Sequence, residues 1–237
     1  MPELHGPEFS RAIPPEFAFN PAFTANRAAA GAYILPHTVL FREGERVRGA
    51  YRLTEGCIVL AQLLADGRRQ IVDVLGPGRL FGMALTPVHL HTAETLSYCL
   101  VERVGDPADL GKELDANLHL MLRRSQAHAT LLGRKTAGER VASAVLDLAA
   151  QFARPSRGRR PAKLTFNLHL TRADLADWLG LTVETVSRYL NRFKRTGLID
   201  FRHPEIITIL DRPSLMSAAG LVSLVPAEGA GFHSATA

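Results

Sequence analysis

The period of hydrophobic and polar positions changes along the chain, and its first regular stretch predicts β-strands. Between Tyr33 and Val104, short apolar runs alternate with glycine-containing turns. The pair Asp66-Gly67 separates two of these runs and is a typical hairpin signal. Several short strands at this spacing predict a small jelly roll, or β-roll, over residues 31–106. The apolar runs cover residues 38–41, 56–64, 70–75 and 94–104.

After Asp106-Pro107 the apolar positions follow a helical period, which predicts one long helix over residues 107–135. Six of these positions are spaced alternately by four and three residues, like the seam of a coiled coil. The seam favours a homodimer, although part of the helix is also expected to lie on its own β-roll. The polar Ser125 and His128 would weaken the pairing. The seam consists of Leu114, Leu118, Met121, Ser125, His128 and Leu132.

Three further segments, residues 1–30, 136–215 and 216–237, differ in pattern from the β-roll. Residues 1–30 are rich in Pro, Ala and Phe without a period, and we interpret them as an N-terminal arm. Residues 136–215 are expected to form one domain that contains a helix, a basic loop over 153–163, two short helices and a β-hairpin, the wing, at 198–210. Residues 216–237 are expected to form a flexible tail after one short helix.

Residues 170–188 contain the start and stop signals of two short helices joined by a tight turn. Thr171 and Asp174 have the spacing of a capping box, which begins the first helix. Gly180 can adopt the left-handed conformation that ends this helix. Thr182 is a good N-cap for the second helix. Helix, glycine turn and helix in this order predict a helix-turn-helix.

The second of these helices has two unlike faces. Apolar side chains recur at Val186, Leu190 and Phe193, and these positions predict the buried face. A charged amphipathic helix on a protein surface is the simpler interpretation of the opposite face, but here the helix follows a helix-turn-helix turn. A row of Glu, Ser and Arg at the start of such a helix is typical of contact with the DNA major groove. The outward row consists of Glu184, Ser187, Arg188, Asn191, Arg192 and Arg195.

Composition and charge agree with a DNA-binding protein and exclude some other classes. The chain has 237 residues, of which 46% are apolar and 22% charged, so neither a disordered nor a membrane protein is indicated. We expect a cytoplasmic protein, because no apolar run approaches about 18 residues and no signal layout is present. Eleven Arg or Lys and four carboxylates lie between Arg154 and Arg202, which favours a polyanionic partner. The basic loop taken alone is more simply a solvated loop.

These residues carry a resemblance to the Crp/Fnr family of bacterial transcription regulators, over about residues 33–215. The sequence Gly180-Leu181-Thr182-Val183-Glu184-Thr185-Val186-Ser187-Arg188 is similar to the Fnr and FixK-type branch. The segment 131–140 resembles the hinge of the family. The resemblance implies an α+β protein: an N-terminal cyclic-nucleotide-binding-like β-roll, a long dimerisation helix and a C-terminal winged helix-turn-helix.

The resemblance also implies how this chain would contact DNA. Glu184, Ser187 and Arg188 correspond to the base-reading set of the branch, on a palindrome like TTGAT-N4-ATCAA. Their chemistry agrees, because arginine pairs with guanine and a carboxylate accepts from cytosine. Thr171 and Thr182 correspond to phosphate-contacting positions, although each of them could serve only as a helix cap. RNA polymerase is the implied protein partner. The other expected phosphate contacts are Arg172, Thr185, Arg192 and Arg195.

The chain departs from the ligand-binding patterns of the family. Phe81-Gly82 is followed by Met83 where cyclic-nucleotide binders have Glu, and His91 stands where they have Arg. Without that arginine the pocket lacks a fixed cation for the phosphate, so cyclic-nucleotide binding is not expected. Two cysteines cannot hold an iron–sulfur cluster that needs four thiolates.

The remaining candidate groups have simpler interpretations as structural residues. Cys57 and Cys99 lie among apolar neighbours and are expected to be buried, with a redox-active thiol as the alternative. His89 and His91 are expected to be ordinary surface or loop histidines rather than haem or metal ligands. No metal-ligand motif, phosphate loop or nucleophile elbow is found, so an enzyme is not expected.

The sequence therefore predicts a homodimeric DNA-binding regulator without a cofactor. The resemblance implies an activator in oxygen, nitrogen or respiratory control that needs no small-molecule effector. The alternative is a sensor of the same family that needs an effector or haem in the β-roll before it binds DNA.

Overall fold

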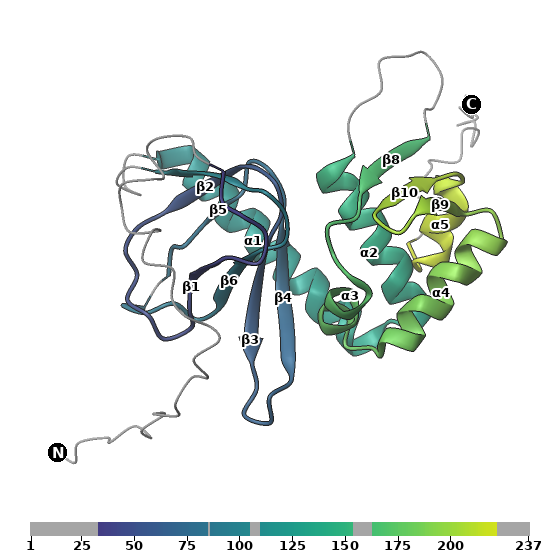
Figure 1. Cartoon of the computed structure of the whole chain (residues 1–237), viewed down its shortest axis with the longest axis horizontal. Coiled ribbons are helices and arrows are strands. Elements are labelled where there is room, and N and C mark those ends of the chain that lie inside the picture. Colours follow the sequence, from purple (N-terminus) through teal and green to yellow (C-terminus); the bar gives the residue numbers. More distant parts are fainter. Residues whose placement is uncertain (1–32, 85, 105–109, 154–162, 222–237) are drawn as a thin grey trace, which may run out of the picture.

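The computed structural model describes residues 33–84, 86–104, 110–153 and 163–221. The predicted N-terminal arm, most of the basic loop and most of the C-terminal tail lie outside these ranges. The described residues form an N-terminal half made of strands and a C-terminal half made mainly of helices, and a long helix connects the two halves (Figure 1).

Seven short strands form the N-terminal half, in two antiparallel sheets with the orders β1-β6-β3-β4 and β5-β2-β7. The side chains that face each other across the two sheets fill the interior, among them Leu53, Ile58 and Leu75. The predicted β-roll is confirmed. The strands are β1 (Val39–Phe41), β2 (Tyr51–Glu55), β3 (Ile58–Leu63), β4 (Arg69–Leu75), β5 (Leu80–Phe81), β6 (Thr92–Thr95) and β7 (Leu100–Arg103).

Two details of the β-roll differ from the sequence pattern. The hairpin at Asp66-Gly67 is present, with Gly67 at a positive φ of 87°. The apolar run over residues 94–104, however, contains two strands rather than one. The chain crosses from one sheet to the other between β6 and β7, where the Ser97 hydroxyl accepts a hydrogen bond from the Cys57 backbone N–H. An unbroken apolar run does not reveal such a crossing.

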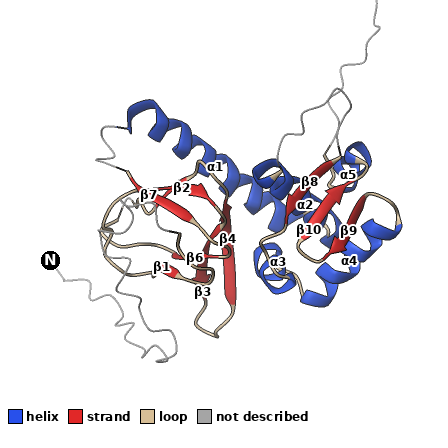
Figure 2. Cartoon of the chain, turned by 45° about the horizontal axis from the view of Figure 1, so that its top comes forward, coloured by secondary structure: helices blue, strands red, loops and turns tan. Residues whose placement is uncertain are grey.

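The C-terminal half places four helices around a three-stranded antiparallel sheet with the order β8-β10-β9 (Figure 2). The predicted wing is present as β9 and β10, but β8 adds a third strand that the sequence pattern did not indicate. The elements are α2 (Ala137–Phe152), β8 (Leu164–Asn167), α3 (Arg172–Leu179), α4 (Val183–Arg195), β9 (Ile199–His203), β10 (Ile206–Ile209) and α5 (Arg212–Ala218).

The long helix α1 (Gly111–Arg134) joins the two halves; one side of it packs against the chain itself, and apolar side chains are also exposed on it. Asn117 and Leu131 are buried against the chain itself, whereas Leu118 and Leu122 leave 46% and 57% of their surface exposed. His128 belongs to the inner side, because its ring stacks on Trp178 of α3 with the centroids 6.2 Å apart. His128, which the sequence assigns to the dimer seam, thus has a ring partner within its own chain.

Polar contacts fix the C-terminal half against the β-roll. At the start of β4, the Arg69 guanidinium pairs with Asp174 of α3 at 2.8 Å and with Glu94 of β6 at 3.1 Å. One hydrophobic cluster also continues from Ile71 and Val74 of β4 into the helices of the C-terminal half. The predicted fold class, a β-roll followed by a long helix and a winged helix-turn-helix, is confirmed.

Candidate nucleic-acid interface

The first helix of the helix-turn-helix begins and ends where the sequence predicts. Thr171 caps α3: its hydroxyl accepts from the Asp174 backbone N–H at 3.0 Å, and the Asp174 carboxylate accepts from the Thr171 N–H at 3.0 Å. Gly180 ends the helix in the left-handed conformation, with φ 59° and ψ 45°. Both signals are local, so residues 171–180 specify this geometry largely by themselves.

The second helix is held by one cap and three buried side chains. The Thr182 hydroxyl accepts from the Thr185 backbone N–H at 3.2 Å, and the Thr185 hydroxyl lies 3.1 Å from it. Val186, Leu190 and Phe193 are buried, as predicted. Thr171 and Thr182 are therefore occupied as caps, and their exposed positions at the helix starts still permit phosphate contact.

The predicted base-reading residues lie together at the start of α4, on the side opposite its buried face. Glu184 and Arg188 are exposed and Ser187 is half-buried. Hydrogen bonds from its own backbone N–H and from Thr182 hold the pKa of Glu184 below its usual value, so this carboxylate is an acceptor at neutral pH. The Arg188 guanidinium extends over the Tyr189 ring, 5.6 Å from its centroid. The start of α4 therefore exposes one hydrogen-bond acceptor, the Glu184 carboxylate, and one bidentate donor, the Arg188 guanidinium.

A cationic concavity of about 460 Å³ lies between α3, α4 and the wing. Arg172 and Lys194 both lie over the Phe201 ring, at 5.6 and 4.4 Å from its centroid. Burial lowers the pKa of Arg172, but an arginine stays charged at neutral pH. Lys194 and Arg202 were not among the predicted site residues, although both belong to the basic stretch of the sequence. The lining consists of Arg172, Ser187, Leu190, Asn191, Lys194, Phe201, Arg202 and Pro204.

The two remaining predicted phosphate contacts, Arg192 and Arg195, are exposed on the second half of α4. Neither of them lines the concavity. The structure thus brings the predicted DNA contacts together on α3 and α4. The predicted dimer contacts lie on α1, a separate element.

Aromatic side chains are buried in the interior of the β-roll. Tyr51, Phe81 and Phe41 are buried there, and the buried His89 stacks on Phe41 with the ring centroids 3.7 Å apart. A Cβ added at Gly82 would lie 2.7 Å from Cδ2 of Tyr51, so side chains already fill the space around this turn.

His91, at the position where the resemblance expects the Arg of cyclic-nucleotide binders, is half-buried. Burial lowers the pKa of His91, so this ring is neutral near pH 7. Within the described ranges, no three His, Cys, Asp or Glu side chains are grouped so that they could hold a metal ion.

The two cysteines are buried, in agreement with their predicted structural role. Burial raises the pKa of Cys57 well above its usual value and also raises that of Cys99. A thiol that stays protonated reacts slowly, because the thiolate is the nucleophile.

Among the described helices, none has the length and apolar character that crossing a bilayer requires.

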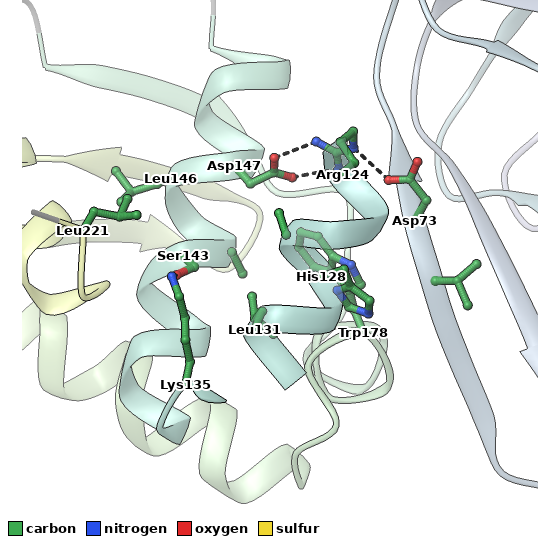
Figure 3. A pocket seen from close by; sticks show the side chains of 13 residues that line it. Asp73, Arg124, His128, Leu131, Lys135, Ser143, Leu146, Asp147, Trp178 and Leu221 are labelled. Carbon is green, nitrogen blue, oxygen red and sulfur yellow. Dashed lines mark hydrogen bonds and ion pairs between the residues drawn. The ribbon is translucent and has the colours of Figure 1, made fainter. Parts of the chain in front are cut away.

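A second cavity, of about 330 Å³, lies at the junction of the two halves, between β4, α1, α2 and α3. Figure 3 shows Arg124 of α1 between Asp73 of β4 and Asp147 of α2, with dashed lines to both carboxylates. The rings of His128 and Trp178 lie beside this network. The buried Nε2 of His128 has no hydrogen-bond partner among the described residues.

Two stretches of the chain match known families. Residues 33–106 match the family described as cyclic nucleotide-binding domain. Residues 139–218 match the family described as Crp-like helix-turn-helix domain. The first match covers the β-roll, and the second extends from α2 to the end of α5.

Similarity to individual proteins extends over most of the chain. It is 32% identical over 225 residues to the nitrogen fixation regulation protein FixK of Azorhizobium caulinodans, which covers 91% of this chain and 89% of that protein. It is 31% identical over 192 residues to the transcriptional activator protein Anr of Pseudomonas aeruginosa, with 76% and 77% of the two chains covered. The structure of FixK2 from Bradyrhizobium japonicum superposes with a TM-score of 0.72 at 29% identity and covers 81% of this chain and 98% of that one. The arrangement of both halves is therefore shared with FixK2.

Proposed function

The chain belongs to the Crp/Fnr family of transcription regulators, and on this premise we propose that it binds, as a homodimer, a palindrome of the TTGAT-N4-ATCAA type. Its relatives are DNA-binding regulators and not enzymes. The names of these relatives support a role in the control of nitrogen fixation or of low-oxygen metabolism.

The exposed row at the start of α4 is the observation that carries the proposal. Arg188 can donate two hydrogen bonds to O6 and N7 of a guanine, and the ionised Glu184 can accept from the amino group of a cytosine. Ser187 can contact either a base or the methyl edge of a thymine. A half-site TTGAT offers a guanine to the arginine and, on its complementary strand, a cytosine to the carboxylate.

Phosphate contacts on both sides of this row would hold the helix in the groove. Arg192 and Arg195 extend the row along α4, and Arg172, Lys194 and Arg202 surround the concavity beside the wing. The caps Thr171 and Thr182 lie at the helix starts, and Thr185 lies in the first turn of α4. Such contacts determine register and affinity rather than sequence.

The outer face of α1 supports dimerisation. Leu118 and Leu122 are exposed there, and Leu114 and Met121 are half-buried; Leu132, also half-buried, packs in addition against the hydrophobic cluster of its own chain. A second copy of α1 would cover these side chains, as in a coiled coil. Ser125 lies exposed on the same helix, and we leave His128 out of the interface because it packs on Trp178.

The filled interior of the β-roll supports DNA binding without a small-molecule effector. Phe41 and Phe81 are among the side chains buried there. The alternative is a sensor that needs an effector or haem in the roll, and the match of residues 33–106 to a cyclic nucleotide-binding domain is the observation that favours it. We further propose that the DNA-bound dimer activates transcription by contacting RNA polymerase.

The test is fluorescence anisotropy of the purified, aerobic, ligand-free protein at fixed salt, with the palindrome and a scrambled duplex of equal composition. We expect the palindrome to bind on the order of a thousandfold more tightly. Equal affinity for both duplexes would contradict the proposed recognition. Light scattering on the same samples measures the oligomeric state.

A further inference from the structure

Arg140, in the first turn of α2, lies where the ends of three helices meet. Its Nε donates to the Lys135 carbonyl just after α1 at 3.0 Å, and one terminal nitrogen, Nη2, donates to the Leu132 carbonyl near the end of α1 at 2.7 Å. The other terminal nitrogen, Nη1, donates to the Leu179 carbonyl, the last residue of α3, at 3.0 Å. One side chain therefore joins the end of α1 to the turn of the helix-turn-helix.

These acceptors are groups that a helix cannot satisfy by itself. The last four carbonyls of an α-helix have no partner within the helix, and they carry a partial negative charge that favours a cation. A guanidinium presents five N–H groups in one rigid plane, so it fixes the directions of several acceptors at once. A lysine at this position has the same charge but only a flexible point donor.

The end of α1 also touches the turn directly. A Cβ added at Gly180 would lie 3.3 Å from Cδ2 of Leu132 and 3.6 Å from Nη1 of Arg140. Only two residues, Lys135 and Thr136, separate α1 from α2, and Thr136 caps α2 through a capping box with Glu139. The connection is short and closely packed, so these contacts act together with the His128–Trp178 stack to fix the direction of α1 relative to α3.

We infer that Arg140 is a positioning residue that sets the angle between α1 and the helix-turn-helix, and so sets the half-site spacing that the dimer accepts. The inference rests on the proposed function, in which two α1 helices pair and each carries one recognition helix. Arg140 does not touch DNA in this scheme. It determines where the second recognition helix lies once the first is in its groove.

The half-site spacing that the dimer prefers is a sensitive measure of the angle between α1 and the helix-turn-helix. One additional base pair between the half-sites moves the second half-site by about 3.4 Å along the axis and by about one tenth of a helical turn. A rigid junction cannot follow this movement, and a spacer of the wrong length then loses contacts of one protomer. A loosened junction can follow it at little cost.

The experiment compares duplexes with spacers of three, four and five base pairs, at fixed salt, for the full chain and three variants. Arg140→Ala removes the contacts, and Arg140→Lys keeps the charge but not the fork. Arg134→Ala is the matched control, because this exposed arginine at the end of α1 lies close to the same junction. Light scattering and thermal unfolding establish that each variant is a folded dimer.

We expect the wild type and Arg134→Ala to prefer one spacer by about tenfold or more, which corresponds to roughly 1.4 kcal/mol. Both Arg140 variants should bind the three spacers within about threefold of one another. They should still reject a half-site whose guanine is replaced, because the base-reading row is unchanged. A general loss of structure would lower both kinds of selectivity together.

Two results overturn the inference: Arg140→Lys with the wild-type spacer preference, or Arg140 variants that lose base selectivity as well as spacing. If Arg140→Ala does not fold, Arg140→Lys decides by the same criteria. Failure of the proposed function is distinguishable, because the wild type would then bind palindrome and scrambled duplex equally at every spacing.

Discussion

Replacing Arg124 with methionine should destabilise the junction between the β-roll and the C-terminal half. The guanidinium joins three elements: it pairs with Asp73 of β4 at 2.9 Å and with both carboxylate oxygens of Asp147 of α2 at 2.7 and 3.0 Å. Burial alone would lower the pKa of Arg124, but the hydrogen bonds to Asp147 and the charge of Asp73 raise it above its usual value. The charged form of Arg124 is therefore the one that these contacts favour.

The loss of unfolding free energy depends on which partners Asp73 and Asp147 keep when Arg124 is replaced. Removing one partner of a buried ion pair costs roughly 3–5 kcal/mol, because the other charge is left uncompensated. Here Asp73 keeps Arg79 at 2.8 Å, and Asp147, whose side chain is 32% exposed, keeps Gln151 at 2.9 Å. Methionine also retains much of the packing of the arginine stem. We expect the lower end, about 3 kcal/mol.

Urea unfolding followed by tryptophan fluorescence measures this change, because Trp178 is the only tryptophan in the chain and lies in α3 at the same junction. With a slope of about 3 kcal/mol per molar urea, a loss of about 3 kcal/mol moves the midpoint by about 1 M. Arg123→Met is the control. Arg123 is the exposed neighbour on the same helix, and its replacement should change the free energy of unfolding by about 0.5 kcal/mol or less.

A midpoint for Arg124→Met that equals that of Arg123→Met would refute this reasoning, since it would mean that the network contributes no net stability. The double variant Arg124→Met with Asp147→Leu separates two causes. If the cost of the single change is an uncompensated carboxylate, removing Asp147 as well should recover part of the loss. If the double variant is less stable than either single one, lost packing is the cause instead.

Three further predictions concern DNA binding, assembly and pH. Arg188→Ala should weaken specific binding by roughly 1–3 kcal/mol and relax the preference for guanine, whereas Arg192→Ala should weaken all duplexes about equally and reduce the salt dependence; anisotropy with base-substituted half-sites separates the two. Leu118→Glu should yield monomers in light scattering, while the same change at the exposed Thr130 should leave dimers. The free energy of unfolding should fall as pH falls below about 6.5, because burial lowers the pKa of four histidines and the unfolded chain binds protons that the native chain does not; equal urea midpoints at pH 7.5 and 5.5 would contradict this. These histidines are His89, His91, His128 and His169.

The helix-turn-helix could be predicted from the sequence because its signals are local. Thr171 with Asp174, and Thr182 with Thr185, form their cap hydrogen bonds within three residues, and Gly180 supplies the left-handed conformation of the turn. The apolar spacing of α4 then identifies its buried face. None of these features depends on a distant partner, so the sequence pattern was sufficient.

Two features that depend on distant partners were not predicted. Strand β8 exists because Leu164 to Asn167 pair with Ile209 to Ile206 of β10, more than 35 residues further on. Within the concavity beside the wing, Lys194 of α4 meets Arg172 of α3 only through the Phe201 ring of β9. A four-residue run or a single lysine carries no sign of such a contact in its own neighbourhood.

The seam of α1 shows a third kind of limit. A spacing of four and three residues identifies apolar positions, but a helix has 3.6 residues per turn, so a straight stripe drifts around the axis by about 20° in each heptad. Leu118 remains on the outer face, whereas His128, ten residues later, faces Trp178 of its own chain. Periodicity alone could not divide the stripe between an internal and an external partner.

Two arginines act on α1 in different ways, and this difference allows stability and geometry to be measured separately. Arg124 lies in the middle of α1 and pairs with carboxylates of two other elements. These ion pairs contribute to the free energy of unfolding. Arg140 donates to backbone carbonyls at the ends of α1 and α3. These hydrogen bonds contribute to the direction of α1 relative to the helix-turn-helix. Arg124→Met should therefore shift the urea midpoint and keep the spacer preference of the folded dimer, whereas Arg140→Lys should change the spacer preference with a smaller shift of the midpoint. If both variants changed both quantities in the same proportion, α1 would act as one loosely held element, and the separate positioning role of Arg140 would be wrong.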